Sequence, residues 1–305
     1  MKCDKCDERA IEHIRYSGAH LCSHHFCEFV EKRAAKEMKN QAINKNEKIA
    51  VALSGGKDSS TALFILKKIL PNDLEAITIN EGIQGYRDKT IETAKKNCEK
   101  LGIKHSIMNL KDETGFSMDD VYNIYEKKQL KHRECSYCGV MRRYYLNKKA
   151  REVGAGYLAI AHNLDDMAQQ VLMNFVKNDL KRGLPPYTKK MEEFVPRILP
   201  LRKVPEREVA IYAILNNIDF LGGACPYAKF AERNRFREIV NILEEGSPGS
   251  RHGMIKSYDS IKGSMTTNKR IGNCEMCGEL TSNRICKRCE MVMILKDMKE
   301  NKKGK

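Results

Sequence analysis

A loop with two adjacent glycines is the first place in the chain where chemistry is expected. It reads Ser54-Gly55-Gly56-Lys57-Asp58-Ser59-Ser60 and lies between an apolar run at 48–53 and an apolar-periodic run at 61–70. A buried strand that turns through glycines into a helix offers free backbone N–H groups and the positive end of the helix dipole to an anion. The loop lacks the four-residue spacer of a Walker A motif. We therefore predict a phosphate-binding loop of another class; a plain Ser/Gly turn is the alternative.

A second polar group follows another apolar run. His162-Asn163-Leu164-Asp165-Asp166 comes directly after the predicted strand 157–161. In a parallel sheet this junction lies on the same carboxyl edge as the glycine loop. Carboxylates at that edge could hold Mg²⁺ against bound phosphates, and we favour Asp166, together with Asp58. The ordinary alternative is that Asn163 or Asp165 caps a helix.

Most of the twelve cysteines form groups with the spacing of metal ligands. Each end of the chain carries two such pairs, which predicts a structural zinc knuckle at each terminus. His24 and Cys27 compete with His25 for the fourth position of the first knuckle. Cys98 lies in an apolar stripe at helical spacing and is predicted to be a core residue. The predicted ligands are Cys3, Cys6, Cys22 and His25, and then Cys274, Cys277, Cys286 and Cys289.

Three cysteines remain outside both knuckles. Cys135 and Cys138 form a CxxC pair, and Cys225 precedes a proline far along the chain. Three thiolates could hold a [4Fe–4S] cluster with one iron left open to a small ligand. With His132 they could instead form a third zinc site, or the pair could act as a redox dithiol. Spacing alone favours none of these three.

The composition indicates a folded, basic protein. The 305 residues are 41% hydrophobic, and 55 Lys and Arg stand against 40 Asp and Glu, for a net charge of +15. This excess favours a polyanionic partner, nucleic acid first, although a generally Lys-rich surface is the alternative. The start of the chain is charged and does not resemble a signal peptide, and no apolar segment approaches the length of a membrane span. We expect a cytosolic protein with no membrane partner.

Alternating strand and helix patterns from residue 48 onward predict an α/β fold. They indicate a parallel sheet with helices on both faces. After the CxxC pair the pattern predicts a helix at 140–153, and later helices at 165–177, 205–217 and 228–244. Residues 178–196 are predicted to be a basic loop and 246–253 to be rich in turns. We divide the chain into a knuckle at 1–28, a central domain at 29–204, a helical segment at 205–268 and a second knuckle with a basic tail at 269–305.

Taken together, these motifs resemble the TtuA/NcsA group of PP-loop tRNA 2-thiolation enzymes. The resemblance covers nearly the whole chain and implies a PP-loop ATPase domain. The loop at 80–83 and the segments 85–88 and 166–175 are closer to the cytosolic wobble-uridine thiolases of the NcsA type than to the enzymes that act in the T-loop. In the T-loop enzymes a lysine stands where this chain has Arg142, which cannot titrate at neutral pH. The matching motifs are the N-terminal Cys/His knuckle, Ser54–Ser60, Cys135–Gly139, His162–Asp166, Cys225 and the C-terminal knuckle.

The resemblance implies a specific reaction. The uridine C2 oxygen attacks the α-phosphate of ATP, pyrophosphate leaves, and sulfur then replaces the adenylated oxygen. Mg²⁺ and Lys57 would balance charge, and a [4Fe–4S] cluster on Cys135, Cys138 and Cys225 would deliver hydrosulfide. These three cysteines, Asp58 and Asp166 are the implied catalytic residues. The implied ATP site comprises Ala52, Ser54, Gly55, Gly56, Lys57, Asp58, Ser59, Ile79, Ala161 and Asp166.

The resemblance also implies partners: tRNA, a sulfur donor (sulfide, a persulfide or a ubiquitin-like thiocarboxylate carrier) and a second copy of the chain in a homodimer. Two other functions are weighed against it. A different PP-loop tRNA-modifying ligase would use the cysteines only structurally. A zinc-knuckle RNA-binding protein would not use its ATP loop at all.

Overall fold

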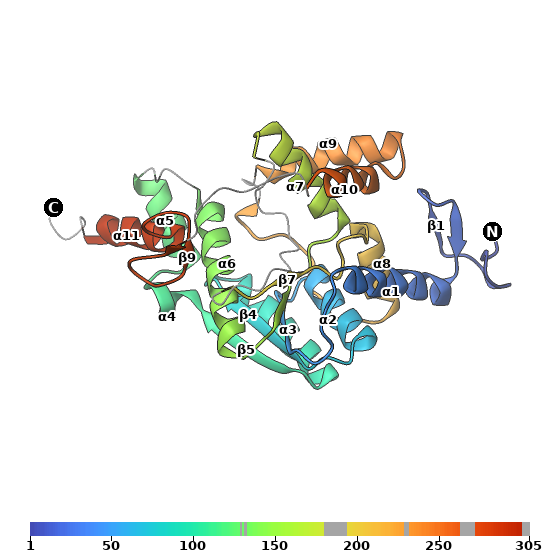
Figure 1. The fold of residues 1–305 in the computed structure, drawn as a ribbon, viewed down its shortest axis with the longest axis horizontal. Coiled ribbons are helices and arrows are strands. Elements are labelled where there is room, and N and C mark those ends of the chain that lie inside the picture. Colours follow the sequence, from blue (N-terminus) through green and yellow to red (C-terminus); the bar gives the residue numbers. More distant parts are fainter. Residues whose placement is uncertain (129, 131–132, 180–193, 229–231, 263–271, 301–305) are drawn as a thin grey trace.

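The structure is a computed structural model, and it describes residues 1–128, 130, 133–179, 194–228, 232–262 and 272–300 (Figure 1). His132, most of the predicted basic loop and the end of the basic tail lie outside these residues. The terminal Cys-rich segments lie at opposite ends of the molecule, on either side of a central sheet. Among the described residues, no helix combines the length and the apolar character needed to cross a membrane.

A five-stranded parallel sheet forms the centre, as predicted. The strand order is β5-β4-β3-β6-β7, so the chain starts in the middle of the sheet and builds outward on both sides. In register, Val51 lies between Ala76 and Ala159. Both faces of the middle strands are buried, which explains why they are continuous apolar runs. The strands are β3 Ile49–Ala52, β4 Leu74–Asn80, β5 Lys104–Asn109, β6 Tyr157–Ala159 and β7 Arg197–Ile198.

Helices cover both faces of this sheet. Val51 packs in one core cluster with residues of α2 (Lys57–Ile69) and α3 (Arg87–Leu101), whereas Ala50 packs in another with residues of α6 (Glu134–Glu152). The alternation follows from the two-residue period of a strand. Cys98 is buried in the first cluster, as predicted. The shorter α4 (Leu110–Thr114) and α5 (Met118–Lys128) complete the face that carries α6.

The two ends of the chain dock onto different helices. At the N-terminus, the hairpin β1 (Glu12–Ile14) and β2 (Ala19–Leu21) leads into α1 (Ser23–Asn40), which shares a core cluster with α8 (Glu206–Leu215). Helix α1 begins at Ser23, inside the segment 1–28 that was assigned to the N-terminal knuckle. At the C-terminus, β8 (Gly272–Asn273) and β9 (Leu280–Thr281) precede α11 (Lys287–Glu300), which packs on α6.

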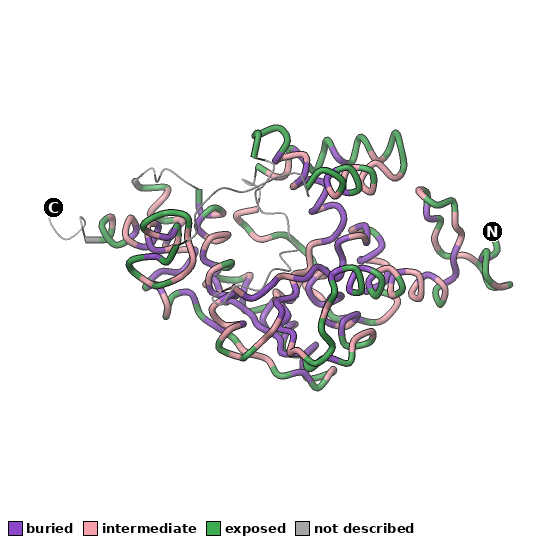
Figure 2. Tube along the Cα trace, viewed as in Figure 1, coloured by how far each residue is buried: buried purple, intermediate pink, exposed green. Residues whose placement is uncertain are grey.

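Three helices form a layer beside the sheet: α7 (Leu164–Val176), α9 (Arg233–Gly246) and α10 (Ser250–Ile261). The prediction of a turn-rich segment at 246–253 was wrong in its second half. Gly249 takes a left-handed φ of 100° and turns the chain directly into α10. Phe175, near the end of α7, is 48% exposed. Figure 2 shows that the sheet is buried whereas much of α9 is exposed.

A polar network joins the N-terminal hairpin to this helical layer. Tyr16 donates to the Glu208 carboxylate, and the Arg33 guanidinium donates both to Glu208 and to Nε2 of His252. Burial and, after it, the positive charge of Arg33 lower the pKa of His252 to about 4. Arg251 adds to this lowering, whereas Glu244 opposes it. His252 is therefore neutral at pH 7.

We expect this histidine to make stability fall in mild acid. The unfolded chain binds a proton at His252 near pH 6.5, but the folded chain binds it only near pH 4. The free energy of unfolding therefore falls as pH decreases from 6.5 to 4, by up to about 2 kcal/mol at pH 5. Urea unfolding at pH 7 and pH 5 should show a smaller pH difference for His252→Gln than for the wild type. Equal pH differences in the two proteins would contradict this expectation.

Candidate functional site

Backbone geometry explains why the phosphate-type loop needs Gly55. Gly55 has a left-handed φ of 81°, and a Cβ at this position would lie 1.9 Å from the carbonyl oxygen of Thr90 in α3. The loop is closed by the Ser59 hydroxyl, which lies 2.9 Å from the Ser54 hydroxyl and accepts from the Ser54 N–H at 3.1 Å. Gly56 is the N-cap of α2, so the loop leads directly into the helix start. The predicted strand–loop–helix arrangement is confirmed.

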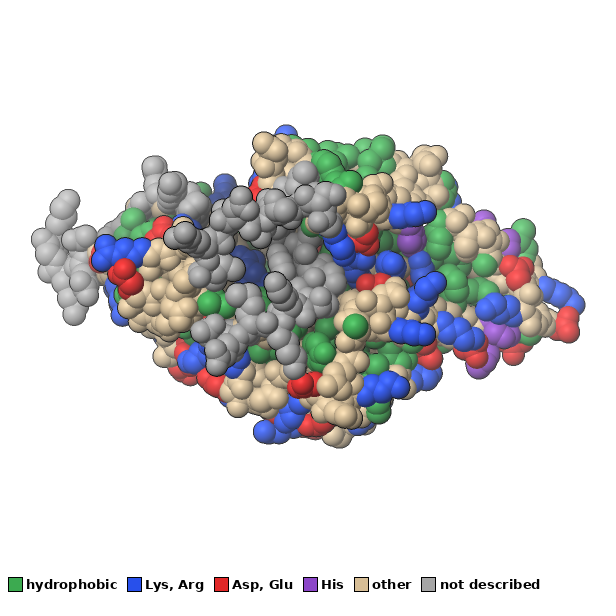
Figure 3. Space-filling view, viewed as in Figure 1, with side chains coloured by type: hydrophobic (Ala, Val, Ile, Leu, Met, Phe, Trp, Pro, Cys, Tyr) green, Lys and Arg blue, Asp and Glu red, His purple; other side chains and the backbone are tan. Residues whose placement is uncertain are grey.

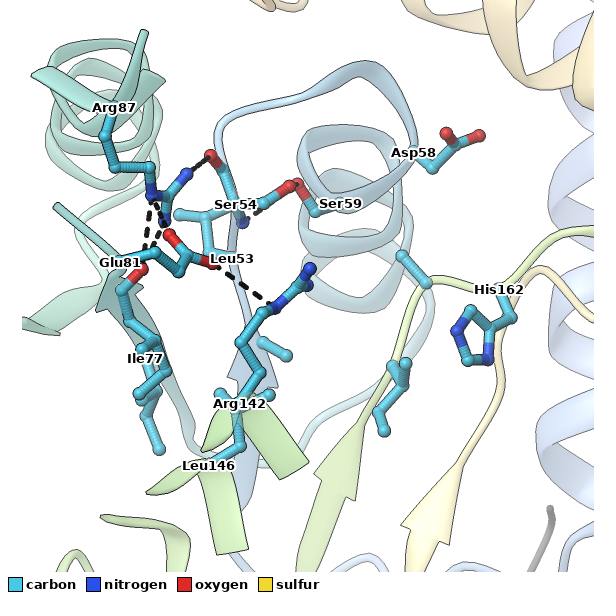
Figure 4. Close-up of a pocket in the computed structure, with 14 residues that line it drawn as sticks. Leu53, Ser54, Asp58, Ser59, Ile77, Glu81, Arg87, Arg142, Leu146 and His162 are labelled. Carbon is cyan, nitrogen blue, oxygen red and sulfur yellow. Dashed lines mark hydrogen bonds and ion pairs between the residues drawn. The ribbon is translucent and has the colours of Figure 1, made fainter. Parts of the chain in front are cut away.

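A buried arginine holds the loop against the neighbouring strand. Arg87 donates to the carbonyl of Ser54 at 2.8 Å and to the carbonyl of Ile79, and its guanidinium pairs with Glu81. The other Glu81 oxygen lies 3.3 Å from Nε of Arg142 in α6. Figure 4 shows this chain of contacts from Ser54 through Arg87 and Glu81 to Arg142. Sequence reasoning assigned no role to Glu81 or Arg87, although their place after β4, at the carboxyl edge, was a usable signal.

A pocket of about 140 Å³ opens beside the loop. Six of the ten residues implied for ATP line it, whereas Gly55, Gly56, Lys57 and Asp166 are not among its described lining residues. Lys57 instead pairs with Asp58 at 2.8 Å. The six that line the pocket are Ala52, Ser54, Asp58, Ser59, Ile79 and Ala161.

Asn163 links the two polar groups at the sheet edge. Its side chain accepts from the N–H of Asp166 as the N-cap of α7 and donates to Asp58 at 3.0 Å. Asp166 completes a capping box and also pairs with Arg233 at 3.1 Å. Asp165 points elsewhere: it accepts from the N–H of Glu206. The Asn163 side chain therefore joins the Asp58 carboxylate to the backbone N–H of Asp166, which keeps the two residues adjacent at the sheet edge.

His162 was part of the predicted polar group but had no assigned role. Its side chain lines the pocket, facing it from the end of β6 (Figure 4). Burial lowers the pKa of His162, and the positive charge of Arg233 contributes to this. The imidazole is therefore neutral at pH 7 and can both donate and accept a hydrogen bond.

The CxxC pair lies on a helix and not in a turn. Helix α6 begins at Glu134, six residues before the predicted start, so Cys135 and Cys138 stand at i and i+3 on one side of its first turns. The remote segment lies against this helix, because the Cys135 thiol contacts the carbonyl of Tyr227 at 3.5 Å. Among the described residues, the three sulfurs do not all lie within 4.8 Å of one another, whereas the ligand atoms of each knuckle do.

The pKa values of Cys135 and Cys138 depend on burial and on the charged groups around them. Burial and, after it, the Glu81 carboxylate raise the pKa of Cys138 to about 12, whereas Arg142 opposes this rise. Burial also raises the pKa of Cys135, and Cys225 contributes. A bound metal would deprotonate such thiols, and three soft sulfur donors beside a guanidinium fit an anionic iron–sulfur group.

Both predicted knuckles bring their four ligands together. In each group the ligand atoms all lie within 4.8 Å of one another. In the first, Nδ1 of His25 is 3.3 Å from the sulfur of Cys22. The competitors point elsewhere, since His24 pairs with Glu28 and the sulfur of Cys27 accepts from Asn216. The geometry therefore selects His25 as the fourth ligand of this group.

Comparison with known proteins matches the central domain and the N-terminal Cys-rich segment to two family models. A family model of a PP-loop domain matches residues 28–243, and a model of the N-terminal LIM domain of the 2-thiouridine synthetase TtuA matches residues 2–27. The tRNA 2-thiolation protein NcsA of Haloferax volcanii is 38% identical, over 96% of this chain and 98% of the relative. The tRNA-5-methyluridine(54) 2-sulfurtransferase of Pyrococcus horikoshii is 33% identical, over 98% of this chain and 96% of the relative.

A solved structure extends the likeness to three dimensions. The U34-tRNA thiolase NcsA from Methanococcus maripaludis, with its [4Fe–4S] cluster, superposes with a TM-score of 0.84 at 35% identity. The match covers 97% of this chain and 96% of that one. The chain therefore belongs to the TtuA/NcsA family of PP-loop tRNA thiolation enzymes.

Proposed function

We propose that this protein is an ATP-dependent tRNA 2-thiolation enzyme that adenylates the C2 oxygen of a uridine and replaces it with sulfur. One observation carries the proposal. The contacts from Ser54 through Arg87 and Glu81 reach Arg142, whose charge acts on Cys138. The nucleotide pocket and the cysteines therefore adjoin, as a reaction that uses both on one atom requires.

The nucleotide pocket supports the first half of the reaction. In this half the uridine oxygen forms a bond to the α-phosphorus, and the bond to the β-phosphate oxygen breaks, releasing pyrophosphate. The N–H groups at the start of α2 and the Ser54 and Ser59 hydroxyls would bind phosphate oxygens. The apolar wall at Ala52 and Ile79 suits a purine ring. Asp58 and Asp166, both bonded to Asn163, would hold Mg²⁺.

The cysteine group supports the second half, in which sulfur adds to C2 and AMP leaves with the former oxygen. Cys135, Cys138 and Cys225 would hold the cluster, consistent with their soft donors and with the cluster of the NcsA structure. When bound, a cluster with three protein ligands leaves one iron that can bind sulfur. Arg142 would offset the negative charge near Cys138 as a fixed cation, since it cannot act as a base at neutral pH.

We propose the wobble uridine as the target. The solved U34-tRNA thiolase NcsA that supports it is 35% identical to this chain, against 33% and 34% for two tRNA-5-methyluridine(54) 2-sulfurtransferases. The segment that resembles the wobble enzymes supplies Glu81 and Arg87 to the pocket wall. The alternative target is the T-loop uridine at position 54. Both terminal Cys groups would hold structural Zn²⁺.

The first test separates the two halves of the reaction. Anaerobically purified Cys225→Ala should lose 2-thiouridine formation about 100-fold or more and lose iron, because one of three cluster ligands is gone. It should still release pyrophosphate with ATP and tRNA, since Cys225 does not line the nucleotide pocket among the described residues. Nucleoside analysis of the tRNA, iron content and pyrophosphate release are measured together.

Cys27→Ala is the matched control, because Cys27 is also a partly buried free cysteine, but its sulfur accepts a hydrogen bond from Asn216. It should keep its iron and its thiolation activity. Full thiolation activity in Cys225→Ala would contradict the proposal that the three cysteines take part in the sulfur step. If the wild-type protein forms neither pyrophosphate nor 2-thiouridine, the proposed function is wrong.

A further inference from the structure

A second cavity, of about 520 Å³, lies between α6 and α7. It shares four lining residues with the nucleotide pocket: Arg142, Leu146, Ile160 and His162. It also reaches Gly139, the residue after Cys138. The cavity therefore borders both the ATP side and the cysteine side of the site. Its volume is in the range of small-ligand sites.

The walls of this cavity are cationic. Five of its described lining side chains are Lys or Arg and two are Asp or Glu, so the excess is three positive charges. One of the two acids, Glu232, pairs with Lys177 at the rim. Lys and Arg side chains are also visible in the recess below α9 and α10 in Figure 3. Such a cavity attracts a phosphodiester backbone.

One wall carries amide groups in a fixed arrangement. Gln170 and Asn174 stand one turn apart on α7, and the Gln170 amide donates to the Asn174 oxygen at 2.7 Å. Arg233 donates to the Gln170 oxygen at 2.9 Å and also pairs with Asp166. Because these bonds orient the amides, they can present a defined donor and acceptor pattern to the edge of a base.

We propose that this cavity receives the target nucleotide of the RNA after it has been flipped out of the stacked strand. The base enters between α6 and α7 toward Arg142 and His162, which places its C2 oxygen at the wall shared with the nucleotide pocket. Its phosphate lies against Arg143 and Lys177. An enzyme that modifies a base atom must expose that base, and an open cavity beside both reactive groups meets this need. This inference rests on the proposed function and specifies its substrate site.

The first experiment locates the base directly. The uridine that the wild-type enzyme thiolates is identified first and is then replaced by 4-thiouridine in a full-length tRNA. After irradiation of the complex with a non-hydrolysable ATP analogue, we expect the cross-linked peptides to come from 139–146 and 170–177. Cross-links confined to other segments would overturn the inference. That result would leave the proposed function unaffected, because the reaction of the wild-type enzyme has by then established it.

The second experiment tests the phosphate contact. Arg143→Gln should raise the KM for tRNA about 10-fold and leave the KM for ATP within about twofold, because Arg143 lines this cavity but not the nucleotide pocket. Arg237→Gln is the control: Arg237 is an exposed arginine on α9 that does not line the cavity among the described residues. Equal tRNA KM values for the two variants would contradict the inference. If the wild type does not thiolate tRNA, the proposed function and this inference fail together.

Discussion

Gly55→Ala is expected to abolish ATP-dependent activity. The new Cβ would lie 1.9 Å from the Thr90 carbonyl oxygen and 2.7 Å from its carbon, and both are backbone atoms that cannot rotate away. The loop and α3 must therefore separate, which moves Ser54 and Ser59 away from their present positions. A displacement of about 1 Å in a catalytic arrangement costs roughly 100-fold in rate. We expect pyrophosphate release with tRNA and ATP to fall by about this factor or more.

Gly115→Ala is the matched control for backbone strain. Gly115 has a φ of 82°, nearly that of Gly55, but a Cβ there meets no atom within 4 Å. Its variant carries the strain of a left-handed alanine, about 1 kcal/mol of stability, without the clash. It should bind ATP and release pyrophosphate as the wild type does. If the two variants lose activity equally, left-handed strain and not the contact with α3 explains the need for glycine.

Loss of metal from the C-terminal knuckle is expected to release α11 from the body of the protein. The segment has little core of its own: its four cysteines form a small cluster, and Leu295 of α11 is buried in the main core beside α6. Structural zinc contributes on the order of 10 kcal/mol to such a segment. Cys286→Ser should therefore lose one metal ion per chain. Hydrogen exchange should become fast throughout 287–300.

The effect should extend to the helix that carries the CxxC pair. Glu279 accepts from Asn147 and Arg151 of α6, and Arg288 donates to the hydroxyl of Tyr145. Exchange in the C-terminal half of α6 should therefore rise as well. Cys98→Ala, which removes a buried cysteine from a different cluster, should keep its metal and its α11 protection. Unchanged metal content in Cys286→Ser would contradict the assignment of this knuckle.

Much of this molecule follows from local patterns in the chain. The loop Ser54–Ser60 is recognisable because strand, glycines and helix start occupy adjacent residues. The sheet follows from short apolar runs that alternate with helical periods. The CxxC spacings at both ends are short enough to predict a common ligand site from sequence. Local sequence patterns therefore predicted the fold class, the phosphate-type loop and the position of the cysteine groups.

Boundaries and helix starts were less predictable. Helix α6 begins at Glu134, because its first turn is held by contact with the remote segment at Tyr227 as well as by its own sequence. Helix α10 was missed because glycines at 246, 249 and 253 suggest turns. Its apolar residues Ile255 and Tyr258 pack against α7, which outweighs the low helix propensity of Gly253.

The chain by itself determined which residue types are available at the site, and only the tertiary structure decided how they are joined. Gly55 needs to be glycine because of a carbonyl at Thr90, in a different helix. Glu81 matters because two arginines from α3 and α6 converge on it. His25, and not His24 or Cys27, faces the knuckle because α1 turns the other two away. Each of these facts depends on segments distant in sequence meeting in space, and residue spacing within one segment carries no information about such contacts.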